Sequence, residues 1–278
     1  MIEPADVPNG GFTNMCWPED PYGSGQTSRT KRRLLTSTAT CSARDSDGRS
    51  VPVSYAVVYL RLHRSKAENA SNRMKLGFRA LAALTPDETA ELVRLADLDL
   101  LRARRLAQFL IGYGLLPDLD VLRAASTAVR PDAPRGDNEF GRGVHALIAE
   151  WPHRSGRLRG ETTFVDAAHD LPGDGLSSTD TEHLQRQAKA AGLTLGYFSR
   201  TIKPHLTLDT LTGQCGHRRV TLEWLAVCAV ERALASALIA ARHLGLYEWP
   251  QDLDVGVVLE TNAGDCFPTQ RFHSMASP

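Results

Sequence analysis

The chain has 278 residues, of which 42% are hydrophobic and 23% are charged, and its 32 basic and 32 acidic residues give a formal net charge of zero. This composition is that of an ordinary globular protein with a sizeable core, which excludes a fibrous chain or one that is disordered throughout. Because the net charge is zero, no field of the whole molecule attracts it to nucleic acid or to an anionic membrane surface.

The first part of the chain is predicted to be an arm followed by a strand and a helix. Residues 1–50 are interrupted by glycines and prolines, so a poorly ordered arm is expected there. Residues 51–62 (VPVSYAVVYLRL) are rich in β-branched and aromatic residues, which predicts a strand. A helix is predicted over residues 66–84.

A further helix is expected to begin at Thr85. Thr85 is a good N-cap, Pro86 fits the first helical position, and Glu88 can complete a capping box. This helix should end near residue 96, and another is predicted over residues 99–111. The second of these helices carries three arginines that we interpret as a solvated face rather than a binding patch: Arg102, Arg104 and Arg105.

The middle of the chain contains the best candidate for a linker. Residues 129–143 include two prolines and three glycines, so we place a domain boundary near residue 135. Residues 136–180 are expected to form this linker and an irregular segment. The predicted units are therefore the arm, a strand-plus-helix domain (51–135), the linker segment, a C-terminal unit (181–262) and a tail (263–278).

The most apolar stretch runs from Leu222 to Leu244 and is apolar on nearly every side, which predicts a long helix buried in the core. Glu231 and Arg232 within it must find partners or reach an edge, and a structural ion pair is the favoured interpretation. Residues 254–261 (DVGVVLET) alternate in hydrophobicity, which predicts a strand packed against this helix.

Together these elements predict a mainly α fold with a few β-strands (α+β), in two loosely separated halves. The N-terminal half is expected to hold a strand and a helical cluster. The C-terminal half is expected to hold the long buried helix packed on a short strand.

Residues 184–203 read LQRQAKAAGLTLGYFSRTIK. This segment resembles the helix-turn-helix unit of bacterial DNA-binding regulators of the Cro and AraC kinds. In that family a small residue, here Ala188, lets two helices cross closely, and a glycine four positions later, here Gly192, makes the tight turn with positive φ. The other matching positions anchor and cap the second helix: Leu193, Thr194 and Phe198.

The resemblance implies that the second helix enters the major groove of DNA. The residues expected at base edges are Leu195, Gly196, Ser199 and Arg200. The residues expected at phosphates are Arg186, Lys189 and Lys203. Local charge agrees with this hypothesis, because residues 183–219 hold six Arg or Lys and a single acid. Three positions depart from the family pattern: Gln187, Gly196 and Thr201.

A competing interpretation starts from residues 204–208 (PHLTL), which are similar to the H-x-T motif of two-histidine phosphoesterases. In that family two such histidines act as base and acid on a cyclic phosphate or an RNA end, and each Thr or Ser binds phosphate oxygens. His205 and Thr207 would hold these roles. The required second copy could begin at His63 or His153, although both motifs place an arginine where the family prefers an apolar residue.

No complete metal site is predicted. The five cysteines are scattered and never form a C-x-x-C pair, which does not fit a disulfide framework or a structural zinc site. Three small sets offer two or three ligands each: Asp166 with His169, His145 with Glu150 and His153, and Cys215 with His217.

The favoured hypothesis is a regulatory protein that binds DNA without catalysis and without a cofactor. The alternatives are a phosphoesterase that uses His205 and a non-catalytic protein-interaction domain. The first ten residues lack the pattern of a secretory signal, and the charges in the long helix make it a poor membrane span. A cytoplasmic protein is therefore expected, and self-association into a homo-oligomer stays open.

Overall fold

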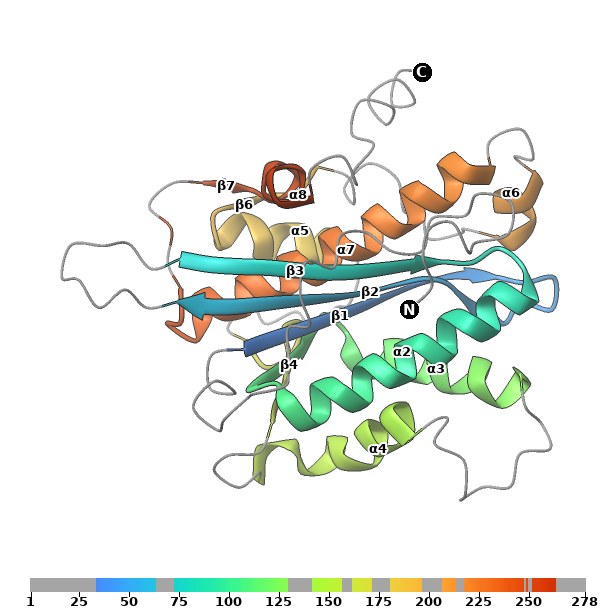
Figure 1. Ribbon diagram of the computed structural model, residues 1–278, viewed down its shortest axis with the longest axis horizontal. Coiled ribbons are helices and arrows are strands. Elements are labelled where there is room, and N and C mark those ends of the chain that lie inside the picture. Colours follow the sequence, from blue (N-terminus) through green and yellow to red (C-terminus); the bar gives the residue numbers. More distant parts are fainter. Residues whose placement is uncertain are drawn as a thin grey trace.

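The structure is a computed structural model that describes residues 34–63, 73–129, 142–156, 162–171, 181–196, 207–213, 218–247, 249 and 252–263. Its main strands are β1 (Leu34–Arg44), β2 (Ser50–His63), β3 (Arg73–Ala82), β4 (Phe109–Gly112) and β5 (Thr163–Asp166). They form one five-stranded sheet in the order β3-β2-β1-β4-β5 (Figure 1). β1, β4 and β5 run parallel to one another, and β2 runs antiparallel to both of its neighbours.

Helices cover both faces of this sheet, so the molecule has three layers (Figure 1). One face is covered by α2 (Pro86–Leu106), α3 (Leu115–Val129) and α4 (Arg142–Glu150), which continues into the 3-10 helix η3 (Trp151–Gly156). The other face is covered by α7 (Arg218–His243), with α5 (Thr181–Ala190) beside it. The short helix α6 (Leu208–Gly213) precedes α7.

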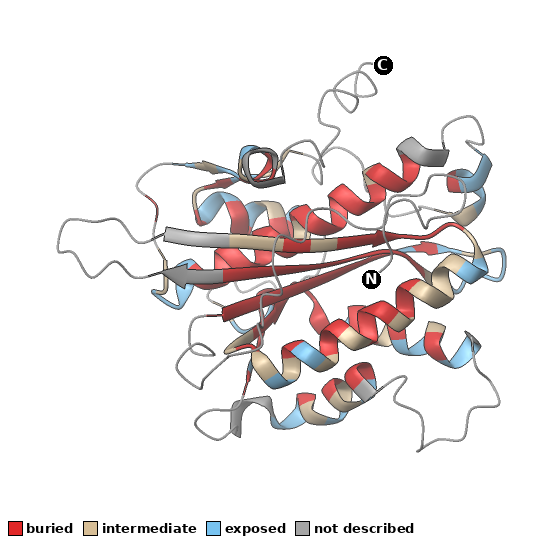
Figure 2. Ribbon diagram, in the orientation of Figure 1, coloured by how far each residue is buried: buried red, intermediate tan, exposed pale blue. Residues whose placement is uncertain are grey.

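The predicted strand over residues 51–62 is confirmed as β2. Val57 and Tyr59 belong to the core under α2, whereas Val58 and Leu60 belong to the core under α7. Because both faces of the sheet are covered, β2 is apolar at consecutive positions and does not alternate with polar residues. Figure 2 shows that burial is concentrated in the sheet and in the sides of the helices that face it.

The predicted start of α2 is also confirmed. The Thr85 hydroxyl accepts the N–H of Glu88, and the Glu88 carboxylate accepts the N–H of Thr85 in return. The helix is continuous to Leu106, so the two helices expected here are one. Residues 109–112 form β4 instead of a helix end, because Leu110 and Ile111 are both fully buried in the sheet.

The long buried helix is confirmed as α7, which begins four residues earlier than expected. Within the described residues it is the one helix that is long and apolar enough, by length and composition, to cross a membrane. However, 89% of that apolar window is buried inside the protein against the sheet. The helix therefore serves as the core element of the layer that it occupies.

The prediction of a mainly α fold is wrong, because helix makes up 56% and strand 26% of the described residues and a sheet forms the centre. β1, the middle strand, lies in the region predicted to be a poorly ordered arm. Its sequence LLTSTATCSAR is rich in Ser and Thr, so it lacks the apolar pattern that predicts a buried strand. Residues 34–41 are nevertheless buried. β3 consists largely of good helix formers, and its pairing with β2 overrides that propensity.

The predicted strand over residues 254–261 is helix α8 (Val255–Ala263). Val255 and Leu259, four positions apart, are buried, which fits one face of a helix; Val257 is exposed, whereas in a strand all three would share one face. The Asp254 carboxylate accepts the N–H of Val257 and so caps the helix. A small two-stranded sheet of β6 (Leu193–Thr194) and β7 (Leu253–Asp254) precedes it.

The predicted domain boundary near residue 135 lies outside the described residues. Elements on the two sides of it share one sheet, because β5 pairs with β4 and α7 packs across β1, β2 and β3.

Candidate functional site

Helix α5 places two cations of the predicted DNA-binding unit on its outer face. Arg186 and Lys189 are exposed, whereas Leu184 and Ala188 are buried in the core shared with α7. Residues three positions apart on a helix are neighbours on its surface, so the two cations lie side by side. The buried face fixes the helix to the protein, and the opposite face, which carries Arg186 and Lys189, is exposed to solvent.

Gly192 forms the turn that ends α5, as predicted. Its φ is 68°, in the left-handed region that favours glycine. The indole N–H of Trp249 donates to the Gly192 carbonyl at 3.2 Å, and Arg242 donates to the Ala191 carbonyl at 2.6 Å. The Arg242 guanidinium also lies 5.2 Å from the centre of the Trp249 ring. These contacts from α7 and the segment after it hold the turn in place.

The chain after the turn differs from the family pattern. Leu193 and Thr194 form β6, so no helix begins at Thr194. Leu195 is half-buried against the core, and the N–H of Gly196 donates to the Glu231 carboxylate at 2.6 Å. Leu195 and Gly196, which were expected at base edges, are thus held against the protein body. The other expected contacts lie outside the described residues: Ser199, Arg200 and Lys203.

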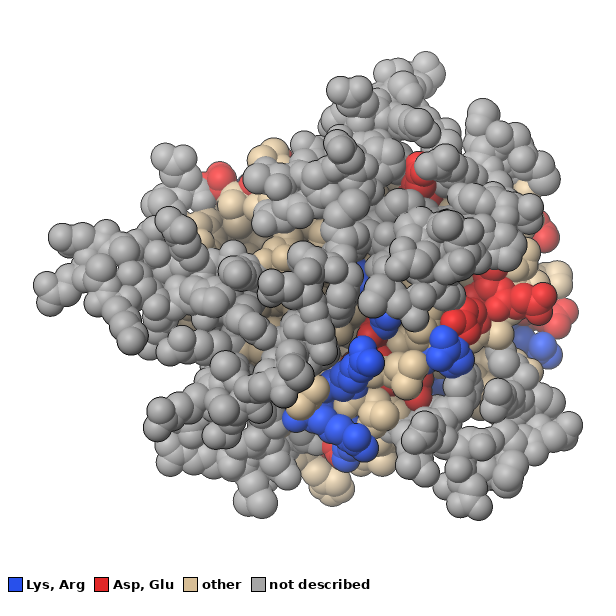
Figure 3. All heavy atoms as spheres, in the orientation of Figure 1, with Lys and Arg blue, Asp and Glu red and all other residues tan. Residues whose placement is uncertain are grey.

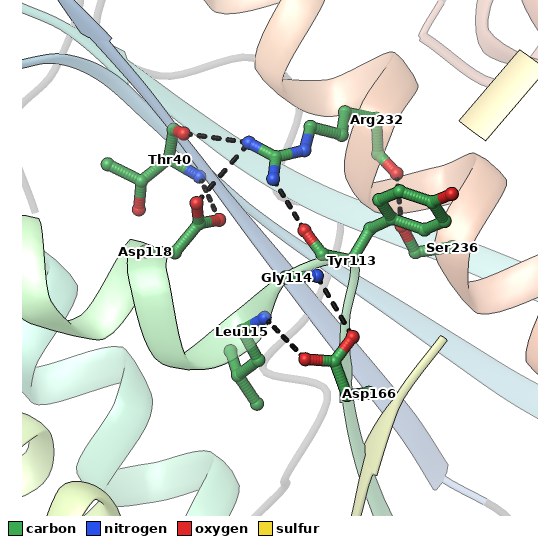
Figure 4. A network of polar contacts seen from close by, with 8 residues as sticks. All are labelled: Thr40, Tyr113, Gly114, Leu115, Asp118, Asp166, Arg232 and Ser236. Carbon is green, nitrogen blue, oxygen red and sulfur yellow. Dashed lines mark hydrogen bonds and ion pairs between the residues drawn. The ribbon is translucent and has the colours of Figure 1, made fainter. Parts of the chain in front are cut away.

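A second group of polar side chains lies at the carboxyl ends of the parallel strands β4 and β5, beside the middle of β1 (Figure 4). The guanidinium of Arg232 on α7 is 3.3 Å from the Asp118 carboxylate on α3 and donates to the carbonyls of Thr40 and Tyr113. Asp118 also accepts the N–H of Thr40 at 2.9 Å. The side chains of Arg232 and Asp118 are only 13% and 11% exposed. Arg232 has therefore found the structural partner that its place in an apolar helix requires.

Asp166, the last residue of β5, caps helix α3 from outside (Figure 4). Its buried carboxylate accepts the N–H groups of Gly114 at 2.9 Å, Leu115 at 3.1 Å and Ala168 at 3.0 Å. The first N–H groups of a helix have no partner within it, and a negative charge is favourable beside them. Asp166 therefore fixes the start of α3 and, with it, the position of Asp118.

The carboxyl ends of parallel strands are the usual ligand-binding edge of an open α/β sheet. In this protein Arg232 reaches between Tyr113, just after β4, and Thr40, within β1. The Asp118 and Asp166 carboxylates are already engaged by Arg232 or by backbone N–H groups. Among the described residues, no group of three His, Cys, Asp or Glu side chains could hold a metal ion. We therefore assign these two carboxylates a structural role.

Burial raises the pKa of the Asp118 carboxyl from 3.8 to about 6, although Arg232 and the Thr40 N–H lower it. The neighbouring Asp166 carboxylate adds to the increase. Since the pKa of the folded state exceeds that of the unfolded state, folding favours the protonated form. The stability that Asp118 contributes is thus fully present below pH 3.8 and is lost as the pH rises through 6.

Asp118→Asn replaces this carboxyl with a group that does not titrate. We expect the variant to be destabilised relative to the wild type by more at pH 4 than at pH 7. Only the wild type gains stability when Asp118 is protonated. Urea unfolding of both proteins across this range measures the difference. A loss that stays constant or grows toward pH 7 would show that Asp118 has an ordinary or lowered pKa.

Buried polar contacts connect this cluster to α5. The Tyr113 hydroxyl lies 2.6 Å from Nδ1 of His183 on α5, and both residues are 1% exposed. The carbonyl of the same Tyr113 accepts the guanidinium of Arg232. The orientation of α5 is therefore determined by polar contacts as well as by its apolar face.

The phosphoesterase hypothesis depends on His205, which lies outside the described residues. Thr207 immediately precedes α6, and its hydroxyl accepts the N–H of Thr210 at 3.2 Å, as a helix cap does. His153 is exposed in η3, and His63 ends β2. The structure thus gives Thr207 a local structural role.

The predicted metal-ligand sets are divided among other contacts. Glu150 pairs with Arg104, and Asp166 caps α3 as described above. Cys215 and His217 lie outside the described residues.

No protein-family model matches the chain, and no curated protein matches it.

Proposed function

We propose that this protein binds DNA through the cationic face of α5 and the segment that follows the Gly192 turn, in a non-catalytic and regulatory role. The observation that carries the proposal is the pair of exposed, adjacent cations Arg186 and Lys189 on a helix whose opposite face is locked into the core. Such a surface presents positive charge to phosphates without first ordering a mobile element.

Local charge supports this assignment. Residues 183–219 hold six Arg or Lys and one acid, although the whole chain is neutral. Phosphate contacts supply most of the sequence-independent part of DNA affinity, and a local excess of cations is enough for them. The turn contacts of Arg242 and Trp249, together with the buried His183–Tyr113 pair, keep the surface in one orientation.

The part of the proposal that concerns DNA sequence depends on residues after the turn. Leu195 and Gly196 face the protein, so base contacts are left to Ser199 and Arg200, with Lys203 as a further phosphate contact. Sequence preference would be visible as tighter binding to one duplex than to a scrambled duplex of the same length and composition.

The variant Arg186→Glu/Lys189→Glu tests the proposal. The affinity of the wild type for a short duplex should fall steeply between about 50 and 200 mM salt, with a slope of about 0.9 for each phosphate contact on logarithmic axes. In the variant we expect weaker binding and a slope reduced by about 2. Fluorescence anisotropy of a labelled duplex at several salt concentrations gives both quantities.

Arg49→Glu/Arg123→Glu is the matched control, since it causes the same change in net charge. Arg49 and Arg123 are exposed, and each is already paired with a neighbouring aspartate. The control should bind almost as the wild type does. If the wild type shows no salt-dependent binding, or if the two variants weaken it equally, the proposed surface is wrong.

A further inference from the structure

Helix α2 carries a second group of cations. Its first turn contains Asp87 and Glu88, whereas its last turn contains Arg104 and Arg105. Figure 3 shows, on the face that it presents, the largest group of Lys and Arg side chains toward one end of α2 and the largest group of Asp and Glu toward the other, with some of each kind between them. The C-terminal half of α2 is therefore a local positive surface on a neutral protein.

Most arginines in this region are neutralised by an acid of the protein itself. Arg94 pairs with Glu91, Arg104 pairs with Glu150, and Arg79 of β3 pairs with the buried Asp99. Arg102 and Arg105 differ from these in that both are exposed. Arg102 also interacts with the charge of the buried Asp99: burial raises the pKa of that carboxyl, and Arg79 and Arg102 lower it.

The two arginines lie three positions apart, about 4.5 Å along the helix axis, so their guanidinium groups can reach the same anion. Like charges at this spacing disfavour the helix slightly. Arg105 gains from the helix dipole in the last turn, but Arg102 precedes that turn. Guanidinium groups bind phosphate through paired hydrogen bonds, and DNA offers regularly spaced phosphates.

This surface faces away from α5. The buried residues of α2, such as Leu92 and Leu100, belong to the core on one face of the sheet, and Leu184 and Ala188 of α5 belong to the core on the other. Figure 1 shows the sheet between the two helices. Because DNA is stiff, with a persistence length of about 50 nm, one duplex cannot follow both faces without strong bending.

Although the sequence pattern favours a solvated face for these arginines, we propose that Arg102 and Arg105 form a second phosphate-contacting surface, so that one molecule holds two DNA segments, one on each side of the sheet. This inference rests on the DNA binding proposed for α5. Beyond the binding of one duplex, it proposes that the protein joins two duplexes.

A capture experiment with the full chain tests the inference. One duplex is immobilised, the protein is added, and retention of a second, fluorescent duplex is measured at low and at high salt. The wild type should retain the second duplex at low salt only. Arg102→Glu/Arg105→Glu should reduce retention by about tenfold or more, because one hydrogen bond to a charged group is worth about tenfold in affinity. Its affinity for a single duplex in anisotropy should change much less.

The variant Arg102→Gln/Arg105→Gln serves as a second measurement, because glutamine preserves the helix propensity if the charge reversal disturbs folding. It should also lose retention. If the arginines stabilise only the end of α2, the substitutions lower the melting temperature without reducing capture, and the inference is overturned. Capture by a dimer through α5 alone would likewise be insensitive to both variants.

The outcomes separate this inference from the proposed function. A wild type that binds one duplex and retains no second duplex overturns the inference alone. A wild type that binds no DNA overturns both. Loss of capture in the α2 variants, with single-duplex binding lost in Arg186→Glu/Lys189→Glu, supports both.

Discussion

Replacement of Arg232 by alanine is expected to lower the free energy of unfolding by about 3–5 kcal/mol. The change removes the cation from a nearly buried pair and leaves the Asp118 carboxylate without it. It also removes the donor to the carbonyls of Thr40 and Tyr113. A buried charge that has lost its partner costs more than an exposed pair contributes. Urea unfolding followed by circular dichroism at neutral pH measures the loss.

Arg94→Ala is a matched control for this prediction, because it removes the same side chain from an exposed pair with Glu91. Its cost should stay below about 1 kcal/mol. Arg232→Lys should recover part of the stability, since it keeps the charge but lacks the planar group that reaches three acceptors at once. If Arg232→Ala and Arg94→Ala cost the same, the cluster at the strand ends does not stabilise the fold.

Asp166→Ala is expected to cost about 3 kcal/mol or more. The substitution takes the acceptor from the buried N–H groups of Gly114, Leu115 and Ala168, and each unsatisfied group costs about 1–3 kcal/mol. Since the first two begin α3, the start of that helix should exchange its amide hydrogens faster. Urea unfolding and hydrogen exchange measure the two effects.

Asp166→Asn should cost less than the alanine variant, because the amide keeps one acceptor oxygen. Asp120→Ala on the same helix gives a baseline, since Asp120 is 47% exposed and pairs only with Arg123. An Asp166→Ala protein as stable as Asp120→Ala would exclude the capping role.

The candidate DNA-binding surface could be predicted only in part. The exposure of Arg186 and Lys189, the burial of Ala188 and the positive φ of Gly192 follow from helical spacing and from the special conformation of glycine. The position of Leu195 and Gly196 could not be predicted in this way. Glu231, which accepts the N–H of Gly196, and β7, which pairs with Leu193 and Thr194 just before them, come from distant parts of the chain.

The cluster at the strand ends was missed for a similar reason. Arg232 was expected to need a partner, but nothing near it in sequence identifies Asp118, which lies on a helix of the other half of the chain. The sequence offers Asp166 as a metal ligand together with His169. The position of Asp166 could have predicted its capping role. It ends a short buried strand, where a carboxylate can meet the N-terminus of a neighbouring helix.

Local sequence alone determines the capped start of α2 at Thr85, the burial of α7 and the left-handed turn at Gly192. Each depends on residues within a few positions of one another, so the pattern and the structure coincide. Tertiary structure alone decides that the hydroxyl-rich β1 is the middle strand, that the helix-favouring β3 pairs with β2, and that residues 255–263 form a helix. In these segments local preference is weak or ambiguous, and the free energy gained by burial between two helical layers selects the conformation.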